Sequence, residues 1–179
     1  IYLWGLSKND YRAMQTSTQL TEGIVSIGIM TQFLKHITGR QSPFKSTEDG
    51  GLWRVFPNQL DYAQNVPAYD AFPSGHLATA MVTVTVLAEN YPEKRYIKPL
   101  GYSLMGVLSF SMLNNGVHWV SDYPLSIAMG YVVGKITVAR GRRRIEKEQN
   151  GQVSNFQKNS RWTPMYSLGF VGLGWQYQF

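Results

Sequence analysis

The chain has 179 residues, enough for one domain with a hydrophobic core. With 44% hydrophobic and 16% charged residues, its composition is that of a globular protein and argues against disorder over most of its length. A formal net charge of +6 favours anionic partners, and the absence of cysteine excludes disulfide bonds, thiolate catalysis and cysteine-based zinc sites. Since the chain starts at Ile1 rather than at methionine, we expect sequence upstream, with a signal segment or an anchor left open.

The first strong helical pattern covers about residues 10–38. Apolar residues recur along it at helical spacing, and Gly39 provides a stop signal. The residues that we expect on its apolar face are Ile24, Ile27, Phe33 and Leu34. Residues 40–73 are rich in proline and glycine and are predicted to form a long ordered loop, a kind of segment that is usually functional in compact domains.

Three more helices are predicted behind this loop. One starts after Ser74 and ends before Pro92, the next covers about residues 99–113, and the last covers about residues 123–139. The longest stretch without a charged residue or histidine, residues 99–117, contains glycine, serine and asparagine, which favours a buried helix over a membrane span. Helices of this number and length predict an all-α helical bundle.

The end of the chain has a different character. Residues 140–148, RGRRRIEKE, are interpreted as a solvated helix end, with contact to an anionic membrane surface as the alternative. The cations concerned are Arg140, Arg142, Arg143 and Arg144. The tail at 151–179 ends with Trp175, Tyr177 and Phe179 alternating with polar residues, which predicts a short extended segment or β-hairpin packed on the body. We therefore expect a single α-helical domain at 1–150, followed by this tail.

The sequence PSGH, Pro73 to His76, has the features of an anion-binding site. Proline disfavours helical geometry in the residue before it, and Ser74 is a natural N-cap for the helix behind it. Gly75 leaves room for a ligand to approach the backbone. The free amides and the positive dipole end of the helix favour an anion there, with His76 in the first turn. An N-cap followed by an incidental histidine is the alternative interpretation.

The stretch SMLNNGVHWVSD places His118 four residues before Asp122. At this spacing the carboxylate can accept a hydrogen bond from one imidazole nitrogen. Such a bond fixes the tautomer, raises the basicity of the ring and leaves the other nitrogen free to attack or to shuttle protons. A helix pair with a purely structural role is the alternative.

Basic residues gather at the end of the first predicted helix. Lys35 and Arg40 flank that end, and Lys45 follows just beyond it. Cations at a helix C-terminus usually complement the helix dipole. His36 belongs to no recognisable pattern and is interpreted as a surface or packing residue.

Taken in this order, the three elements resemble the type 2 phosphatidic acid phosphatase superfamily, which includes lipid phosphate phosphatases, class A acid phosphatases and vanadium haloperoxidases. The family carries K-x6-R-P, then P-S-G-H, then S-R-x5-H-x3-D, on a helical bundle. The resemblance covers roughly residues 20–140, and its middle motif is complete. The matching positions are Lys35, Pro43, Pro73, Ser74, Gly75, His76, Ser111, His118 and Asp122.

The resemblance implies metal-free and cofactor-free hydrolysis of a phosphomonoester. It implies that His118 attacks phosphorus and forms a phosphohistidine, while Asp122 orients its ring. It also implies that His76 protonates the leaving oxygen and then activates water. The groups expected to bind the phosphate are Lys35, Ser74, Gly75 and Arg40.

Two arginines of the family pattern are absent. Ser42 stands where the first motif has arginine, and Met112 stands where the third motif has it. A charge-assisted hydrogen bond is worth about 1.5–3 kcal/mol. Losing two therefore costs about 3–6 kcal/mol, or about two to four decades in binding or rate. The nearby cations considered as replacements are Arg40, Lys45 and Arg54.

The expected substrate is a lipid phosphate, a pyrophosphate or a small phosphomonoester, with a location in a bacterial cell envelope, periplasmic or membrane-associated. The alternative is a catalytically impaired family member that binds phosphate or lipid headgroups, or that scaffolds an envelope assembly. Nucleic acid is disfavoured as a partner, because the basic run has no interleaved aromatic motif. The sequence does not predict the oligomeric state.

Overall fold

The structure, a computed structural model, describes residues 1–149, 160–167 and 170–177. The chain divides into two units, Ile1–Ala139 and Arg140–Phe179. The helices are α1 (Tyr2–Lys8), α2 (Tyr11–Thr38), α3 (Gln59–Gln64), α4 (Gly75–Asn90), α5 (Ile97–Asn114) and α6 (Tyr123–Gln149). Short 3-10 turns are formed by η1 (Pro43–Lys45), η2 (Val66–Ala68) and η3 (Val120–Asp122). The predicted all-α helical bundle is confirmed, and in the described part of the chain no helix is long and apolar enough to cross a membrane.

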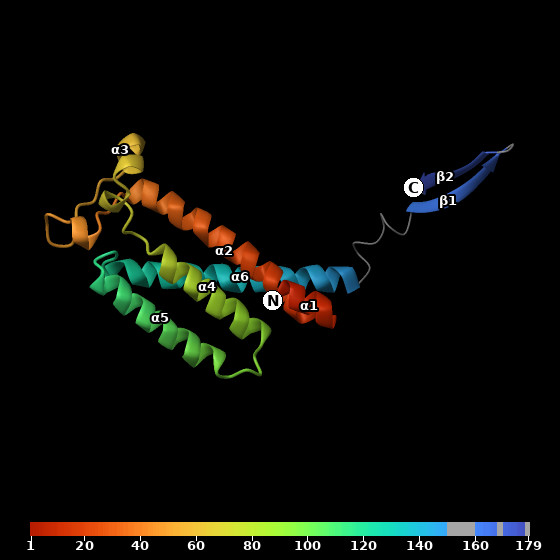
Figure 1. The fold of residues 1–179 in the computed structure, drawn as a ribbon, viewed down its shortest axis with the longest axis horizontal. Coiled ribbons are helices and arrows are strands. Elements are labelled where there is room, and N and C mark those ends of the chain that lie inside the picture. The colour runs from red at the N-terminus through yellow and green to blue at the C-terminus, as the bar shows by residue number, and fades with distance from the viewer. Residues whose placement is uncertain (150–159, 168–169, 178–179) are drawn as a thin grey trace. The chain divides into compact units, whose positions relative to one another are not determined.

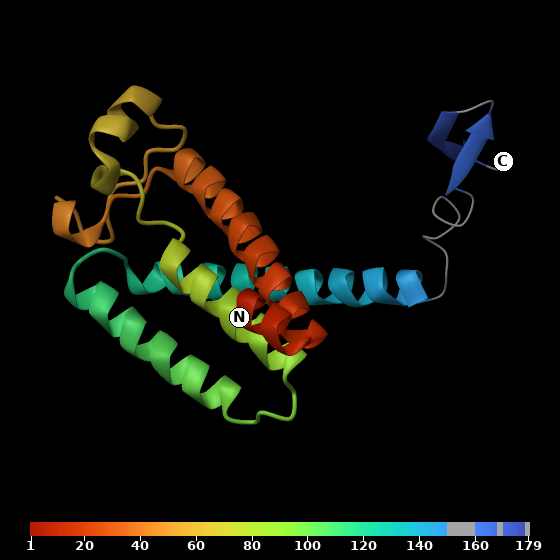
Figure 2. The ribbon, with the colours of Figure 1, turned by 45° about the vertical axis from the view of Figure 1, so that its right-hand side comes forward.

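Helix α4 lies between α2 and α5, and it also contacts α6 (Figures 1 and 2). Small residues permit this close packing. A Cβ atom on Gly23 of α2 would meet Val82 of α4 at 2.7 Å, and one on Gly101 of α5 would meet Val84 at 2.6 Å. The side chains of one buried cluster at these contacts are Ile27, Ala78, Val82, Val86, Val133 and Val138. The three long helices around α4 therefore hold its first turn in a fixed place.

Helix α2 ends as predicted, but its buried face differs from the predicted one. Gly39 adopts a left-handed conformation (φ 53°) and its amide donates to the Lys35 carbonyl at 3.0 Å. Ile27 is buried, whereas Ile24 and Phe33 are 39% and 65% exposed. The buried residues of α2 are Ala13, Thr16, Gln19, Gly23, Ile27, Thr31 and Lys35. The buried side chains of this face are small or polar. Threonine can be buried there because its hydroxyl donates to a carbonyl of its own helix, as Thr31 does to the Ile27 carbonyl at 2.9 Å.

The loop of residues 40–73 lies where α2 ends and α4 begins (Figure 1). It contains α3 and two of the 3-10 turns, and isolated bridges pair Arg40 with Trp53 and with Asp70. The amide of Ala71 donates to the Arg40 carbonyl at 3.0 Å. These backbone contacts bring three distant parts of the loop together beside the start of α4.

Helix α6 continues beyond its predicted end at residue 139, because the charge run is itself helical up to Gln149. In the second unit, β1 (Ser160–Ser167) and β2 (Phe170–Tyr177) pair antiparallel, with Trp162 opposite Trp175. The predicted hairpin is thus confirmed. The predicted domain end at residue 150 lies outside the described residues, and packing of the tail on the body stays a prediction.

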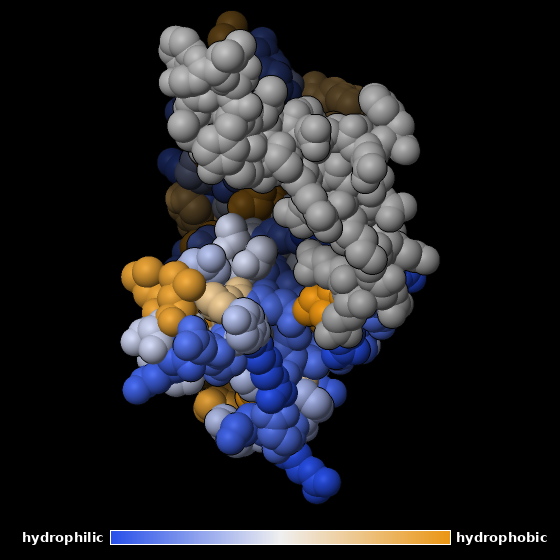
Figure 3. Space-filling model, turned by 90° about the vertical axis from the view of Figure 1, so that its right-hand side faces the viewer, coloured by the Kyte–Doolittle hydropathy of each residue, from blue (hydrophilic) through white to orange (hydrophobic). Residues whose placement is uncertain are grey.

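Large hydrophobic side chains are exposed along the long helices of the first unit. On α5 they include Leu100, Leu104, Val107 and Phe110, between 55% and 72% exposed. Helices α2 and α6 expose others, among them Ile29, Phe33, Tyr131 and Val132. Figure 3 shows one face of the molecule, where hydrophobic patches in orange lie among hydrophilic residues in blue. Exposed apolar residues that gather into a patch mark contact with a partner, a ligand or a membrane.

Candidate active site

The three segments singled out in the sequence meet at one end of the bundle. Lys35 comes from the last turn of α2, His76 from the first turn of α4, and His118 from the connection between α5 and α6. The rings of His76 and His118 lie edge to face with their centroids 6.0 Å apart. Lys35 and His76 line the same pocket. The fold therefore brings together residues that are more than eighty positions apart along the chain.

His118 is held by a backbone carbonyl. Its Nδ1 lies 2.6 Å from the carbonyl oxygen of Ala71, and the residue is 1% exposed. A carbonyl only accepts, so Nδ1 carries the proton and Nε2 carries the lone pair. Within the described residues, Nε2 is buried and has no hydrogen-bond partner. The tautomer with its proton on Nδ1 thus leaves the Nε2 lone pair on the side of the ring away from Ala71.

Asp122 is placed differently from the predicted hydrogen bond to His118. Its Oδ2 lies 3.7 Å from His118 Nδ1, which is ion-pair distance but too long for a hydrogen bond. That oxygen accepts from the Trp119 amide at 2.7 Å, since residues between His118 and Asp122 form the tight turn η3 rather than a full helical turn. The fully buried carboxylate therefore lies at ion-pair distance from the His118 ring without a hydrogen bond to it.

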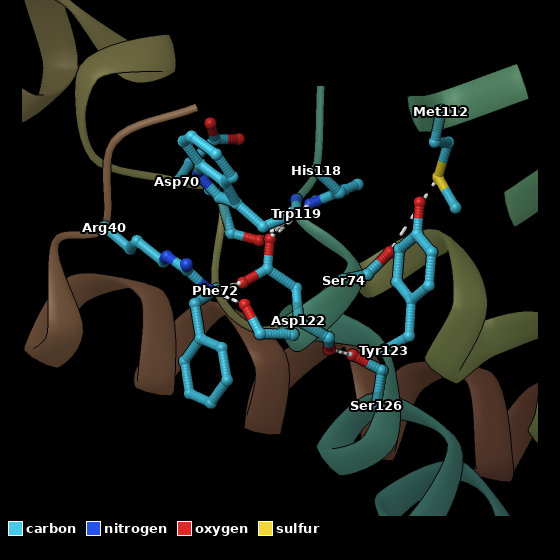
Figure 4. A network of polar contacts seen from close by, with 12 residues as sticks. Arg40, Asp70, Phe72, Ser74, Met112, His118, Trp119, Asp122, Tyr123 and Ser126 are labelled. Atoms are coloured by element: carbon cyan, nitrogen blue, oxygen red, sulfur yellow. Dashed lines mark hydrogen bonds and ion pairs between the residues drawn. The ribbon is translucent and has the colours of Figure 1, made fainter. Parts of the chain in front are cut away.

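Arg40 is directed at Asp122, as Figure 4 shows. Its Nη1 donates to Asp122 Oδ1, and the two side chains are 6% and 0% exposed. The other contacts of its guanidinium are hydrogen bonds to Ser121 Oγ (2.8 Å) and the Gly50 carbonyl (2.8 Å) and ring contacts with Trp53 (4.7 Å) and Trp119 (5.4 Å). Arg40 is not among the residues that line the pockets described next. This geometry favours a positioning role over the predicted contact with phosphate.

Two adjoining pockets open beside His76. The polar pocket, about 460 Å³, is lined by Gly28, Thr31, Gln32, Lys35, Gly75, His76, Thr79 and Leu108. The apolar pocket, about 370 Å³, is lined by His76, Thr79, Ala80, Thr83, Val84, Gly101, Leu104, Met105 and Leu108. They share His76, Thr79 and Leu108. The arrangement suits a ligand with a polar head near Lys35 and an apolar part between α4 and α5.

The pKa of His76 is lowered from its ordinary value of 6.5, chiefly by burial. The neighbouring His118 and Lys35 lower this pKa further, and Asp70 opposes them. His76 is therefore mostly neutral near neutral pH and becomes an acid as the pH falls. Both ionisation states are needed from a group that first donates a proton and later accepts one.

The start of α4 has the predicted N-cap. Ser74 is the N-cap, and its Oγ accepts from the Leu77 amide at 3.4 Å, which confirms the predicted cap. The amides of Gly75 and His76 have no acceptor within the helix. Gly75 lines the polar pocket together with Lys35, whose Nζ lies 3.4 Å from Asp70 Oδ2. No group of three or more histidine, aspartate or glutamate residues is placed as metal ligands in the described part of the chain.

The two positions that lack arginine are buried. Ser42 is 1% exposed, and its amide donates to the Pro67 carbonyl at 3.1 Å. Met112 belongs to the core between α4 and α5, where its sulfur lies 3.8 Å from Ser74 Oγ (Figure 4). Ser111, the other residue of that motif, is exposed. Neither Ser42 nor Met112 supplies a charge to the pockets.

The other candidate replacements also lie away from the two pockets. Arg54 donates to the Ala68 carbonyl at 3.2 Å and lies over the Tyr69 ring at 5.2 Å. Lys45 is exposed beside the Phe44 ring. Neither residue is among those that line the pockets. Among the residues that line the two pockets, Lys35 therefore supplies the positive charge, beside the amides at the start of α4.

Sequence reasoning missed several contributors to the site. The Ala71 carbonyl is a backbone group that any residue would provide, so the sequence could not identify it. Trp53 and Trp119 flank Arg40 from two distant segments, and only the fold brings them together. Asp70 did have a signal, because it is a carboxylate six residues before His76 in a loop expected to be functional.

A helical bundle that places a histidine pair, a buried carboxylate and a lysine from the end of α2 beside the N-terminus of α4 is typical of a class of proteins that handle phosphoryl groups. Residues 17–146 match the PAP2 superfamily, and the chain belongs to it. Over 70 residues the chain is 31% identical to the lipid A 1-phosphatase of Porphyromonas gingivalis. That match covers 38% of this chain and 16% of the relative. No solved structure matches the chain.

Proposed function

We propose that this protein is a phosphomonoesterase that works through a phosphohistidine on His118. The observation that carries the proposal is the state of the His118 ring. Nδ1 is held by the Ala71 carbonyl, and Nε2 is left with a lone pair and no partner among the described residues, beside a second histidine. A ring oriented in this way is prepared for nucleophilic attack.

In the first step His118 Nε2 attacks phosphorus, and the bond from phosphorus to the leaving oxygen breaks. His76 gives its proton to that oxygen. The cationic ring of His118 is stabilised by the Ala71 carbonyl and by the Asp122 carboxylate 3.7 Å away. Arg40 keeps Asp122 in place.

In the second step water attacks the phosphohistidine. His76 takes the proton of the water, the bond between phosphorus and Nε2 breaks, and phosphate leaves. Lys35 and the amides at Ser74 and Gly75 stabilise the charge on the phosphoryl oxygens in both steps. Lys35 and Gly75 line the polar pocket next to His76, which supports this assignment.

A side chain must move before the substrate reaches the nucleophile. His118 is 1% exposed and lines neither pocket. His76 lines both pockets and its ring is 6.0 Å from that of His118. We infer that a rotation of His76 opens Nε2 to the polar pocket when a phosphoryl group binds.

The preferred substrate is a lipid phosphate, and the protein acts at a bacterial membrane, in the envelope or periplasm. The apolar pocket between α4 and α5, the hydrophobic side chains exposed on α5, and the lipid A 1-phosphatase named among the relatives support this. The exposed cations at the end of α6 are proposed to contact anionic headgroups. They are Arg140, Arg142, Arg143 and Arg144.

The experiment compares the wild type with His118→Ala on para-nitrophenyl phosphate and on phosphatidic acid in mixed micelles. We expect the wild type to hydrolyse both and His118→Ala to lose turnover. His36→Ala is the matched control, because His36 bonds to Gln59 and stacks on Tyr62. Retained turnover in His118→Ala contradicts the mechanism. A wild type that binds phosphate without turnover supports the alternative, an impaired member of the family.

A further inference from the structure

The polar pocket is larger than a phosphoryl group requires. Its volume is about 460 Å³, and pockets of roughly 300–1,000 Å³ hold organic ligands of drug size. Gly28 and Lys35 both line it and lie about two turns of α2 apart, so the pocket follows that helix for roughly 10 Å. A phosphoryl group bound by Lys35 and the amides at the start of α4 therefore fills only one end of the pocket.

Gly28 leaves space at the other end. Glycine weakens a helix interior, because it loses more conformational freedom on folding than other residues do. At Gly23 of the same helix the reason for a glycine is packing, since a Cβ atom there would meet Val82 at 2.7 Å. A Cβ atom on Gly28 would meet no atom within 4 Å, so packing does not explain this glycine. Space for a bound ligand in the pocket does explain it.

The walls between the two ends are neutral and can form hydrogen bonds. Gln32 of α2 and Thr79 of α4 line the pocket, and within the part of the chain that the structure describes neither side chain has a hydrogen-bond partner. The Gln32 amide has two N–H donors and a carbonyl acceptor, and the Thr79 hydroxyl both donates and accepts. Thr31 differs, because its hydroxyl already donates to the Ile27 carbonyl at 2.9 Å.

We propose that the part of the polar pocket lined by Gly28, Gln32 and Thr79 is a subsite for a polyol or sugar that carries the phosphoryl group. Hydroxyl groups of the ligand donate to and accept from the two polar side chains, and Leu108 provides an apolar wall for its C–H groups. The substrate class is then a phosphomonoester of a hydroxylated alcohol, with its hydrocarbon chain in the adjoining apolar pocket. The inference rests on the proposed function, since it uses the same nucleophile, acid and lysine.

This subsite selects against substrates without hydroxyl groups. An apolar group that enters it displaces water from Gln32 and Thr79 and offers them no hydrogen bond in return. A pocket that binds hydroxyl groups through hydrogen bonds therefore rejects an analogue that lacks them, whereas an apolar pocket rejects an added hydroxyl group only weakly. The specificity consequently depends on these two side chains.

The test compares two monoesters of six-membered rings, myo-inositol 1-phosphate and cyclohexyl phosphate, which differ in the ring hydroxyl groups. We expect wild-type kcat/KM to be about tenfold higher for the inositol ester. Gln32→Met and Thr79→Val nearly keep the shape of the side chain and remove its hydrogen-bonding group. Each is expected to lower the ratio of the two kcat/KM values by about two- to tenfold. Comparing each variant with the wild type cancels the difference between the two leaving groups.

A further variant tests the space in the pocket. Gly28→Val adds an isopropyl group where a Cβ atom meets no other atom, so we expect the fold to be kept and the ratio to fall by about fivefold or more. Gly106→Val is the matched control, because a Cβ atom on Gly106 also meets nothing within 4 Å but Gly106 lines neither pocket.

Gln64→Met, at an exposed position on α3, is the control for Gln32→Met. We expect both control variants to keep the wild-type ratio. A wild type that prefers cyclohexyl phosphate overturns the proposal, and so does a ratio that the three substitutions in the subsite leave unchanged.

A binding measurement separates the subsite from the proposed function. In His118→Ala, which lacks the proposed nucleophile, thermal stabilisation by the two esters reports affinity without turnover. We expect the inositol ester to stabilise this protein at lower concentration, and Gln32→Met in the same protein to remove the difference. That result, with no hydrolysis of either ester by the wild type, contradicts the proposed function and supports the subsite. Hydrolysis of both esters by the wild type, with equal stabilisation by both in His118→Ala, supports the proposed function and overturns the subsite.

Discussion

The two sides of the site differ in burial and in the pairing of their charges. On the histidine side, Asp122 and Arg40 are buried, the His118 ring is fixed by a carbonyl, and each charge has a partner. On the phosphate side, Lys35 shares an open pocket with one carboxylate, and uncharged side chains occupy the positions of two expected arginines. The groups proposed to transfer protons are thus held by buried contacts, whereas the residues that line the pockets offer the proposed phosphoryl group one lysine. For the proposed phosphatase, we therefore expect binding of the anion to limit activity more than proton transfer does.

The largest expected effect comes from the buried ion pair of the histidine side. Replacing one partner of such a pair leaves the other charge buried and uncompensated, which costs about 3–5 kcal/mol. We expect Arg40→Met to lower the free energy of unfolding by about that amount, measured by urea denaturation, because Asp122 is 0% exposed.

The exposed pair of Arg12 and Glu93 provides the contrast. Its nitrogen and oxygen lie 2.7 Å apart, but the side chains are 44% and 49% exposed. Exposed pairs are screened by solvent and contribute little, so Arg12→Met should lower the free energy of unfolding far less than Arg40→Met does. Arg40→Lys should fall between the two, since an ammonium keeps the charge but not the fork of donors. Equal losses in Arg40→Met and Arg12→Met would show that the histidine side is not organised by its buried charges.

This buried pair also marks the limit of what the sequence predicts. Local signals identified Gly39 as a helix end and Ser74 as an N-cap, since both act through neighbouring backbone groups. They could not identify Asp122 as the partner of Arg40, because the two residues are 82 positions apart and meet only after folding. The apolar pattern of α2 predicted the buried face wrongly for the same reason. Close packing with α4 needs small side chains, so the helix buries Thr31 and exposes Phe33.

The next effect concerns the pH dependence of the acid, His76. Its pKa lies below 6.5, so the protonated form is lost as the pH rises through a value in the acid range. With an alkyl phosphate, whose leaving oxygen needs a proton, we expect kcat to fall over that range. With para-nitrophenyl phosphate the leaving group needs little protonation, and the fall should be smaller.

The phosphate side sharpens this prediction, because Asp70 raises the pKa of His76. Asp70→Asn should therefore move the descending limb of the alkyl phosphate profile to lower pH. The pH–rate profiles of the two proteins, measured on one alkyl phosphate, provide the test. If the descending limb of the profile stays in place in Asp70→Asn, or moves to higher pH, Asp70 does not raise the pKa of the acid. Its charge would then act on Lys35 alone.

The smallest expected effect lies at the apolar pocket, which we propose holds the hydrocarbon part of the substrate. Leu104 lines this pocket and is 61% exposed, so a bound hydrocarbon covers it only in part. Covering a leucine fully is worth about 1.5–3 kcal/mol, and part of that corresponds to about a fivefold rise in KM when Leu104 becomes serine. The rise should occur with a long-chain lipid phosphate and not with para-nitrophenyl phosphate. Leu100→Ser is the matched control, because Leu100 is 55% exposed on the same helix but does not line the pocket. If both variants raise KM equally, the exposed face of α5 as a whole contacts the lipid. Lipid binding by that whole apolar surface, rather than by one pocket, would then compensate for the low positive charge on the phosphate side.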